Sequence, residues 1–453
     1  MRRPNPFGAS GAGRYREAVL APLDLRGADV ATVVLPRPPS GSSDGDEPVE
    51  AVRSIIAEVR AGRDGALLEL TERFDRVRLG SLTVPADELA AAQERIPPDV
   101  RAAIEVAASS VEAFHRTQLV PDHTDERNGF RIASRHLPVD RAGCYVPGGR
   151  AIYPSTVLMT AIPARVAGVP EVVLCVPPGP DGKVPDVTLA AAAVAGVDAV
   201  HPIGGAQAIA AMAYGTESIA PVDVIVGPGN VYVALAKQQV AGDVGVAAAF
   251  AGPSEIVVVA DASVDPAFAA VDVIVQAEHG PGGLAWLLTE DEQVAKAVNA
   301  EIGRLVEAAP RRADIEATLD GGGYAVVVDD LAAAMTVANR IAPEHLQLMV
   351  EDPHALVPLV RHAGAVFCGP LAPASLGDYV AGPSHVLPTA GTARFSGALT
   401  VTDFQKPVHV VEVTQAGFEA AAPHVAALAR AEGLDEHARS VTLRLDALRD
   451  AGR

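Results

Sequence analysis

The residues with the clearest chemical meaning are Gln276 and His279, which follow an apolar run of helical character at 269–275. Residues three apart on a helix share a face, so an amide oxygen and an imidazole nitrogen reach toward one point. Gly280-Pro281-Gly282-Gly283 then ends the helix and leaves both side chains near an open end. This spacing predicts one half of a metal site.

Two later segments offer groups that could complete the site. Asp378 comes just before Gly382-Pro383-Ser384-His385, in a Gly- and Pro-rich loop that carries a carboxylate, a hydroxyl and an imidazole. Glu432 and His437 lie in the C-terminal tail, where the plain interpretation is a helix break with solvated charges. With Asp378 as third ligand and His437 as fourth, two imidazoles, a carboxylate and an amide oxygen would suit Zn²⁺ and also accept Mn²⁺ or Co²⁺.

Pro343-Glu344-His345 places a carboxylate beside an imidazole just before a predicted strand. Adjacent side chains of an extended chain point to opposite faces, so both reach one substrate only from a bent loop, which Pro343 favours. Glutamate and histidine are proton acceptors that work near neutral pH. An isolated pair of this kind is most often ordinary surface, so its role as a pair of general bases is a hypothesis.

Three Gly-rich turns stand where strands should end, at Pro147-Gly148-Gly149, Gly204-Gly205-Ala206-Gln207 and Gly227-Pro228-Gly229-Asn230. The last two each open a helix, whose free N–H groups and positive end favour phosphate. None is a full G-x-G-x-x-G fingerprint, since Tyr232 stands where the third glycine should be. Three such turns in succession nevertheless favour a dinucleotide site. We expect Tyr145 to be exposed beside them and to stack on a ring; the alternative is a buried core tyrosine.

The elements that must position these groups alternate between strand and helix. Short apolar strands are predicted at 171–176, 199–203, 222–226 and 256–259, with helices at 157–168, 185–196, 206–214 and 230–241. A second block has strands near 284–288, 325–328, 346–350 and 365–368, and one more strand near 408–413 precedes a terminal helix. Continuous apolar strands of this kind indicate parallel sheets covered on both faces. The predicted class is α/β, with two Rossmann-like but incomplete α/β domains, plus small N-terminal and C-terminal helical tail segments.

The composition excludes several classes of protein. The chain has 453 residues, of which 20% are charged and 49% hydrophobic, so a mainly disordered protein is excluded. A formal net charge of −20 argues against nucleic-acid or anionic-membrane binding. Three cysteines without a C-x-x-C pair, and no apolar run of membrane-spanning length, predict a soluble cytoplasmic protein. Residues 1–18 and 36–48 are rich in Gly, Ser and Pro and are expected to be poorly ordered.

Taken together, eight motifs in this order resemble the histidinol dehydrogenase family, from about residue 45 to about residue 445. They are Tyr145-Val146-Pro147-Gly148-Gly149, Gly204-Gly205-Ala206-Gln207-Ala208, Gly227-Pro228-Gly229-Asn230, Ala251-Gly252-Pro253-Ser254-Glu255, Gln276-Ala277-Glu278-His279, Pro343-Glu344-His345-Leu346, Gly377-Asp378-Tyr379, and Glu432-Gly433-Leu434 followed by His437. One motif would be weak evidence, whereas eight in order are specific.

The resemblance implies zinc-dependent and NAD-dependent oxidation of L-histidinol to L-histidine through L-histidinaldehyde, in the final steps of histidine biosynthesis. It implies a homodimer whose C-terminal tail crosses to the partner's active site. One Zn²⁺ per subunit would be held by Gln276, His279, Asp378 and His437. The general bases would be Glu344 and His345, and the NAD contacts Tyr145, Gln207 and Asn230. The substrate contacts would be Ser254, Gln276, His279, His345, Asp378, His385, Glu432 and His437.

The predicted domain limits follow from this picture. They are an N-terminal arm at 1–40, a larger α/β domain at 41–143 plus 257–398 with the metal and catalytic residues, an NAD-binding domain at 144–256, and a tail at 399–453.

Four other functions compete with this prediction. A thiol-dependent aldehyde dehydrogenase would use Cys144, but no basic residue is obviously placed to lower its thiol pKa. A related zinc and NAD alcohol dehydrogenase could act on a different small polar alcohol. A zinc hydrolase with Glu344 as base leaves the Gly-rich turns unexplained, and a non-catalytic scaffold leaves the polar loops unexplained.

Overall fold

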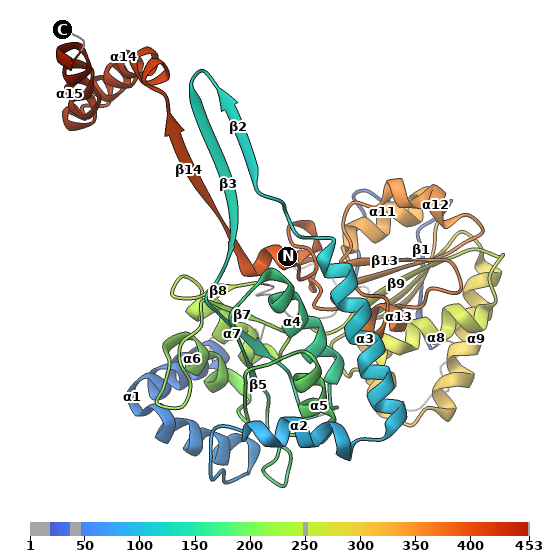
Figure 1. Ribbon diagram of the computed structural model, residues 1–453. Helices are drawn as coiled ribbons and strands as arrows, with labels where there is room; N and C mark the ends of the chain where they lie inside the picture. The colour runs from blue at the N-terminus through green and yellow to red at the C-terminus, as the bar shows by residue number, and fades with distance from the viewer. Residues whose placement is uncertain (1–18, 37–46, 150, 248–251, 452–453) are drawn as a thin grey trace, which may run out of the picture.

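The computed structural model describes residues 19–36, 47–149, 151–247 and 252–451. The predictions of poor order for residues 1–18 and for most of 36–48 therefore lie outside the described residues. The described part folds into two lobes, each built on a parallel sheet, with a long arm that leaves the lobes and ends in two helices (Figure 1).

The larger sheet has six parallel strands in the order β1-β11-β10-β9-β12-β13. Its strands are β1 (Ala21–Asp24), β9 (Glu255–Ala260), β10 (Leu284–Thr289), β11 (Gly323–Val327), β12 (His345–Met349) and β13 (Ala365–Cys368). Helices α8 (Pro266–Ala277), α9 (Glu292–Ala308), α10 (Arg312–Gly322), α11 (Leu331–Ile341) and α12 (Pro353–Leu356) connect them. In β9, Ile256 and Val258 join one hydrophobic cluster while Val257 and Val259 join another. The sheet is thus covered on both faces, as the continuous apolar strands predicted.

The smaller sheet has five parallel strands in the order β6-β5-β4-β7-β8. Its strands are β4 (Arg141–Tyr145), β5 (Glu171–Cys175), β6 (Ala199–His201), β7 (Val224–Val226) and β8 (Gly245–Val246). Its connecting helices are α4 (Pro154–Ala167), α5 (Asp186–Val194), α6 (Gly205–Tyr214) and α7 (Val231–Val240). The strand order reverses between β4 and β7, and ligands of open α/β sheets bind at the carboxyl ends of strands beside such a reversal.

Three helices near the N-terminus wrap the smaller lobe. Helix α1 (Glu47–Asp75) packs on α6 and α7, α2 (Ala86–Arg95) on α5, and α3 (Pro98–Arg116) on α4. Figure 1 shows α1 beside α6, on the side of the smaller lobe that faces away from the larger lobe. The predicted domain limits place residues 41–143 with the larger sheet, whereas the helices of 47–116 pack against the smaller one. The limits themselves stay a prediction.

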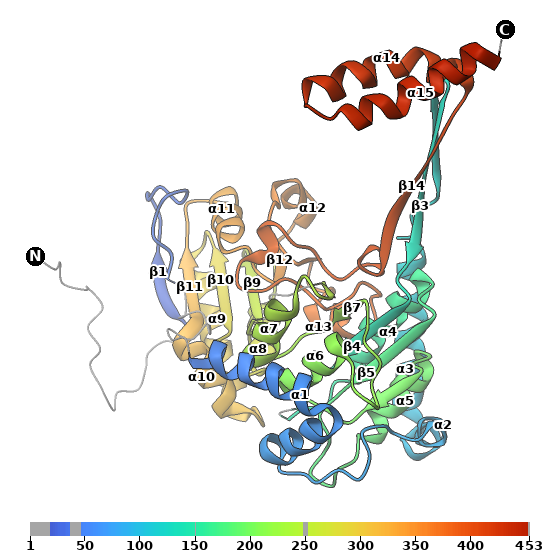
Figure 2. The ribbon, with the colours of Figure 1, turned by 90° about the vertical axis from the view of Figure 1, so that its left-hand side faces the viewer.

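The arm is a three-stranded antiparallel sheet, β14-β3-β2, that the sequence did not predict as a unit. It pairs β3 (Phe130–Pro138) with β2 (His123–Arg127) on one side and with β14 (Gln405–Val413) on the other. Beyond β14 lie α14 (Gln415–Ala431) and α15 (Asp435–Ala451), and both views show these two helices far from the two lobes (Figures 1 and 2).

The predicted class, α/β with two parallel sheets and C-terminal helices, is confirmed. One detail was wrong: the strand predicted at 256–259, grouped with the first block, is β9 in the larger sheet. Strand β1, which lies within the predicted N-terminal segment, pairs with β11 at the edge of the same sheet. No described helix is long and apolar enough to cross a membrane.

Candidate active site

The predicted half-site lies where helix α8 ends. Asp265 caps the start of α8 through the N–H of Ala267, and the helix ends at Ala277. Because α8 joins two parallel neighbours, β9 and β10, it returns toward the amino ends of the strands. Gln276 is buried on the inner face of the helix, and His279 follows in the turn. The cluster thus forms at the amino edge of the larger sheet.

Asp378 comes to this edge from the short helix α13 (Ala374–Tyr379). The amide nitrogen of Gln276 lies 3.5 Å from Asp378 Oδ2. The side chain of His279 is fixed from its other side by Ser254, whose Oγ is 2.7 Å from His279 Nδ1. Residues far apart in the sequence, Ser254, Gln276, His279 and Asp378, are therefore gathered at one point.

Glu344 and His345 enter the same cluster from the start of β12. The chain bends just before them, since Ala342 ends α11 with a left-handed φ of 54°. His345 Nδ1 is 3.6 Å from Glu344 Oε2, and its Nε2 is 3.6 Å from Asp378 Oδ1. The bend lets two adjacent side chains share one site, which an extended strand would prevent.

The hydrogen bonds of His345 fix its tautomer. Its Nδ1 is 3.0 Å from the carbonyl oxygen of Glu255, and a carbonyl can only accept, so Nδ1 carries the proton. Its Nε2 is buried without a hydrogen-bond partner. Glu344 Oε2 in turn accepts from the N–H of Glu255 at 3.0 Å. One residue, Glu255, thus orients both side chains and leaves Nε2 as the atom of His345 that can exchange a proton.

Burial sets the acidity of this cluster. It raises the pKa of Glu344 to about 7, despite the opposing effect of His345. Burial also lowers the pKa of His345, but the carboxylates of Glu344 and Asp378 more than offset this and raise it to about 9. For Asp378, the effect of burial is outweighed by neighbouring His345, and its pKa is lowered. Groups with such displaced pKa values are typical of proton-transfer sites.

His385 closes the cluster on the side of the smaller lobe. Its Nδ1 donates to the main-chain oxygen of Asp378 at 2.9 Å, so its Nε2 accepts from Thr156 Oγ1 at 3.0 Å. Thr156 lies in the first turn of α4. No sequence pattern indicated a role for Thr156, because a threonine in an apolar helix has no distinguishing feature. It links the cluster to the lobe that carries the Gly-rich turns.

The residues present fit a Zn²⁺ ion. Gln276 Oε1 is buried without a hydrogen-bond partner, as expected for an oxygen that binds a cation. Burial lowers the pKa of His279 and favours the neutral imidazole that a metal requires. The described residues hold no group of three or more His, Cys, Asp or Glu side chains placed for a metal. Of the four predicted ligands, Gln276, His279 and Asp378 lie together in the described chain.

A cavity of about 1190 Å³ lies at the carboxyl ends of the smaller sheet. All three predicted cofactor residues line it, together with Gly148, Gly149 and Gly205 from the Gly-rich turns. Gly227 comes so close to the end of β4 that a Cβ atom there would lie 2.0 Å from the carbonyl oxygen of Tyr145. The cavity thus occupies the point where the strand order reverses.

Each predicted cofactor residue also has a structural role. Tyr145 is 3% exposed, so the expectation of an exposed ring was wrong: it ends β4 on the packed face of the sheet, and its hydroxyl accepts from Gly205 N at 3.1 Å. Gln207 is buried in the first turn of α6. Asn230 caps α7 by accepting from the N–H groups of Tyr232 and Val233, which leaves its amide N–H₂ group for a ligand.

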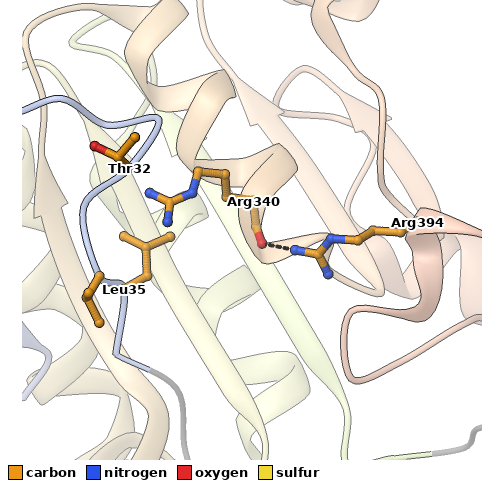
Figure 3. A pocket seen from close by; sticks show the side chains of 5 residues that line it. Thr32, Leu35, Arg340 and Arg394 are labelled. Carbon is orange, nitrogen blue, oxygen red and sulfur yellow. Dashed lines mark hydrogen bonds between the residues drawn. The ribbon is translucent and has the colours of Figure 1, made fainter.

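Glu432 and His437 are not near the cluster in this chain. Glu432 ends α14, and His437 lies in the first turn of α15, so both are exposed at the far end of the arm (Figure 1). A second, smaller cavity lies beside α11 and is lined by Thr32, Val34, Leu35, Arg340 and Arg394. Figure 3 shows Arg394 donating to the main-chain oxygen of Arg340 there, so this cavity is part of the structural framework.

The comparisons with known proteins agree with this geometry. The model of the histidinol dehydrogenase family matches residues 39–445. The chain belongs to the histidinol dehydrogenase family. It is 50% identical over 402 residues to the histidinol dehydrogenase of Synechococcus sp., covering 88% of this chain and 92% of that one. It is 46% identical to that of Gluconobacter oxydans, covering 92% and 96%.

The fold agrees as well. The crystal structure of a histidinol dehydrogenase from Elizabethkingia anophelis superposes with a TM-score of 0.90 at 32% identity, covering 96% of this chain and all of that one. The predicted family and activity class, an NAD-dependent oxidoreductase of histidine biosynthesis, are confirmed by this membership. The competing thiol mechanism is disfavoured by the structure, since burial raises the pKa of the Cys144 thiol to about 12.

Proposed function

We propose that this member of the histidinol dehydrogenase family oxidises L-histidinol to L-histidine in two NAD⁺-dependent steps, at a zinc site shared between two subunits. The observation that supports the proposal most directly is the position of the His345 imidazole. It lies 3.6 Å from a carboxylate oxygen of Glu344 and 3.6 Å from one of Asp378. Asp378 in turn lies beside Gln276. The substrate class fits because an imidazole and an amine are good ligands for a metal held by such groups.

His345 is the residue that takes the alcohol proton. Its Nδ1 is committed to the carbonyl of Glu255, and its unpartnered Nε2 faces Asp378 across 3.6 Å. A proton acceptor must lie within hydrogen-bond reach of the proton that it removes, and Nε2 is the available atom. Because the neighbouring carboxylates raise the pKa of His345 to about 9, we expect it to act as a base increasingly as the pH rises toward that value. Stacking at 6.0 Å against Phe367 supports the ring from the side. His345 then accepts a proton again in the second oxidation.

Glu344 is the residue that activates water for attack on the aldehyde. Burial raises its pKa to about 7, which places its proton affinity where a general base works best near neutral pH. The carboxylate oxygen that accepts from Glu255 N–H, Oε2, is also the one that lies 3.6 Å from His345 Nδ1, so the carboxylate is held at the cluster. The two bases therefore have different tasks although they are adjacent in the sequence.

Gln276, His279 and Asp378 would hold the zinc ion, with His437 of a second subunit as the fourth ligand. A zinc ion held there would orient the substrate and polarise its reacting oxygen. Ser254 orients His279, and Asp378 also attracts His345, so the ligands and the base are coupled. His385 is held neutral between Asp378 and Thr156 and lines the substrate side of the cluster.

The Gly-rich turns would hold NAD in the cavity of the smaller lobe. Tyr145, Gln207 and Asn230 line it, and the first turns of α6 and α7 offer N–H groups to a pyrophosphate. The cofactor supplies the hydride acceptor, and the protein supplies its position. His385 and Thr156 join this lobe to the proton-transfer cluster, so both oxidations can occur at one substrate position.

A homodimer would complete the site. The arm holds Glu432 and His437 away from their own lobes, and four valines of β14 are exposed along it: Val408, Val410, Val411 and Val413. Leu428, Leu434 and Leu443 of the terminal helices are exposed too. Contiguous exposed apolar surface marks a protein interface. A second copy that covers this surface would receive the tail beside its own Gln276 and His279.

The direct test is NADH production by the purified protein from L-histidinol. We expect two NADH for each histidine formed, loss of activity after chelation, and recovery with Zn²⁺. No NADH from histidinol, with NADH from another small polar alcohol, would contradict the proposed substrate.

A further inference from the structure

The wall of the cavity in the smaller lobe includes Ile152 and Tyr153, directly before α4. Thr156, in the first turn of α4, bonds His385 of the proton-transfer cluster. The hydride acceptor must lie next to the carbon that bears the hydroxyl group, whose O–H proton His345 removes, so the nicotinamide belongs beside Ile152 and Tyr153. This assignment depends on the proposed function.

Another part of the cavity wall comes from outside the sheet. It is formed where α1 ends, at Asp75 and Arg76, with Val77 following. Arg76 has a left-handed φ of 62°, so the chain turns sharply away from the helix at this point. Phe74 and Ile55 of α1 line the same wall and give it an apolar surface. An apolar wall with one acidic group suits an adenosine, which has an aromatic base and a ribose diol.

The carboxylate of Asp75 lacks a donor in the described structure. Its Oδ2 is buried without a hydrogen-bond partner. Burial raises the pKa of this carboxyl, and no neighbouring charge offsets the effect. The charge of Asp75 contributes to the raised pKa of the Tyr145 hydroxyl, which places the carboxylate near the end of β4. A buried carboxylate oxygen without a donor is costly, which indicates that a ligand with hydroxyl donors completes it.

We propose that Asp75 accepts hydrogen bonds from the adenosine ribose hydroxyls of NAD and excludes NADP by repelling its 2′-phosphate. In dinucleotide-binding folds an acidic residue takes this role when it follows the second strand of the sheet. Here the acid comes instead from the end of α1, a helix that precedes the sheet in the sequence. Sequence motifs that count from the first Gly-rich turn therefore miss it.

The neighbouring Arg76 could have the opposite effect and favour NADP, because an arginine beside the ribose accommodates the 2′-phosphate. Arg76 is exposed, however, so solvent and salt screen its charge. The Asp75 oxygen is buried, where repulsion of a phosphate is screened far less. Asp75 therefore determines the preference for NAD over NADP while its carboxyl group is ionised. Replacement of Asp75 by a neutral residue leaves Arg76 able to bind the 2′-phosphate.

The test is the binding of cofactor fragments to the zinc-loaded protein, measured by calorimetry. In Asp75→Asn, we expect 5′-AMP to bind about tenfold more weakly and adenosine 2′,5′-bisphosphate about tenfold more tightly. In steady-state assays, the ratio of kcat/KM for NAD⁺ to that for NADP⁺ should fall about a hundredfold. The double variant Asp75→Asn with Arg76→Ala should lose the gain for the bisphosphate.

Glu69→Gln is the matched control, since it removes an exposed negative charge from the same helix outside the cavity wall. It should leave both fragment affinities unchanged. Thermal unfolding identifies a misfolded Asp75→Asn, in which case Asp75→Ser replaces it in the same titrations. Unchanged affinities and an unchanged cofactor ratio in a folded variant would overturn the proposal. Fragment binding needs no histidinol, so failure of the proposed function, seen as no NADH from histidinol in the wild type, is a separate result.

Discussion

At the scale of single residues, the site works because one backbone segment serves two side chains. Glu255 offers its N–H to Glu344 and its carbonyl to His345, so a carboxylate and an imidazole are held within 3.6 Å of each other. Glu344 and His345 could be predicted as adjacent candidates, but nothing in the sequence indicated that the main chain of Glu255 orients both. Main-chain partners of this kind cannot be identified from residue types, because every residue carries the same groups.

Replacement of Glu344 by Gln separates the two oxidations. The amide keeps the shape but cannot accept a proton, so oxidation of the aldehyde should fall by about a hundredfold or more. Oxidation of the alcohol, which relies on His345, should fall by less than about tenfold. Single-turnover formation of NADH from histidinol and from histidinaldehyde measures each step. Glu351→Gln, at an exposed position just beyond β12, is the control, and equal losses in both steps would contradict the division of roles.

Lys237 should make stability depend on pH. It is fully buried in α7, where its Nζ donates to the carbonyl of Gly227, and burial lowers its pKa from 10.5 to about 7. Between these two values the unfolded chain binds more protons than the folded one, so the free energy of unfolding should rise with pH. The contribution is at most about 1.4 kcal/mol for each pH unit.

Urea unfolding between pH 7 and pH 10 measures this effect (an interval of about three units, within the window set by the two pKa values). In Lys237→Met the extra slope should disappear, whatever the change in stability at any one pH. The exposed Lys296→Met, whose amine pairs with Glu292 on α9, is the comparison and should keep the wild-type slope. Identical slopes for wild type and Lys237→Met would show that Lys237 stays protonated in the folded protein.

At the scale of elements, the ends of helices and strands carry the site. The end of α8 could be predicted, because a polar pair followed by glycine and proline after an apolar run is a local signal. The meeting of that end with α13 and β12 could not, since it depends on a sheet order that brings β9 beside β12. The strand near 408–413 was predicted and is β14, but its pairing into the arm was not. The outer strand β2, His123–Arg127, consists of charged and polar residues and lacks the apolar alternation that indicates a strand.

The turn after β7 should tolerate no side chain. Gly227 has φ of 105°, and a Cβ there would lie 2.0 Å from the carbonyl oxygen of Tyr145. Gly227→Ala should therefore displace β4 from β7, lower stability by about 2 kcal/mol or more, and weaken NAD binding. Gly242→Ala is the matched control, because its φ is 112° but nothing lies within 4 Å of the added atom. It should cost only about 1 kcal/mol of backbone strain and leave the cofactor affinity unchanged.

Thermal unfolding and NAD⁺ titration, measured on both variants, distinguish the two effects. Equal losses in Gly227→Ala and Gly242→Ala would show that the left-handed backbone alone matters, and that close approach at the strand reversal does not.

At the scale of the whole molecule, the chain separates the residues that we propose form one active site. The lobes hold Gln276, His279 and Asp378 together, whereas the arm carries His437 and Glu432 away from them (Figure 2). The helices at the end of the arm share only a small core of their own, Ala426, Ala429 and Ala438. A hairpin with so little core and so much exposed apolar surface is better stabilised by a second copy than alone.

Exchange of subunits between two inactive variants tests this arrangement. His345→Asn removes the proposed base from the lobes, and His437→Ala removes the proposed metal ligand from the tail, so each homodimer should be nearly inactive. If the tail serves the partner subunit, a mixed dimer contains one doubly damaged site and one intact site. Random mixing makes about half of the dimers mixed, so co-expression should restore about a quarter of wild-type activity. Co-expression of two lobe variants, His345→Asn and Gln276→Ala, places one of the two substitutions in every site and should restore no activity. If the tail returned to its own lobes, neither pair would recover activity, because each site would keep the fault of its own chain.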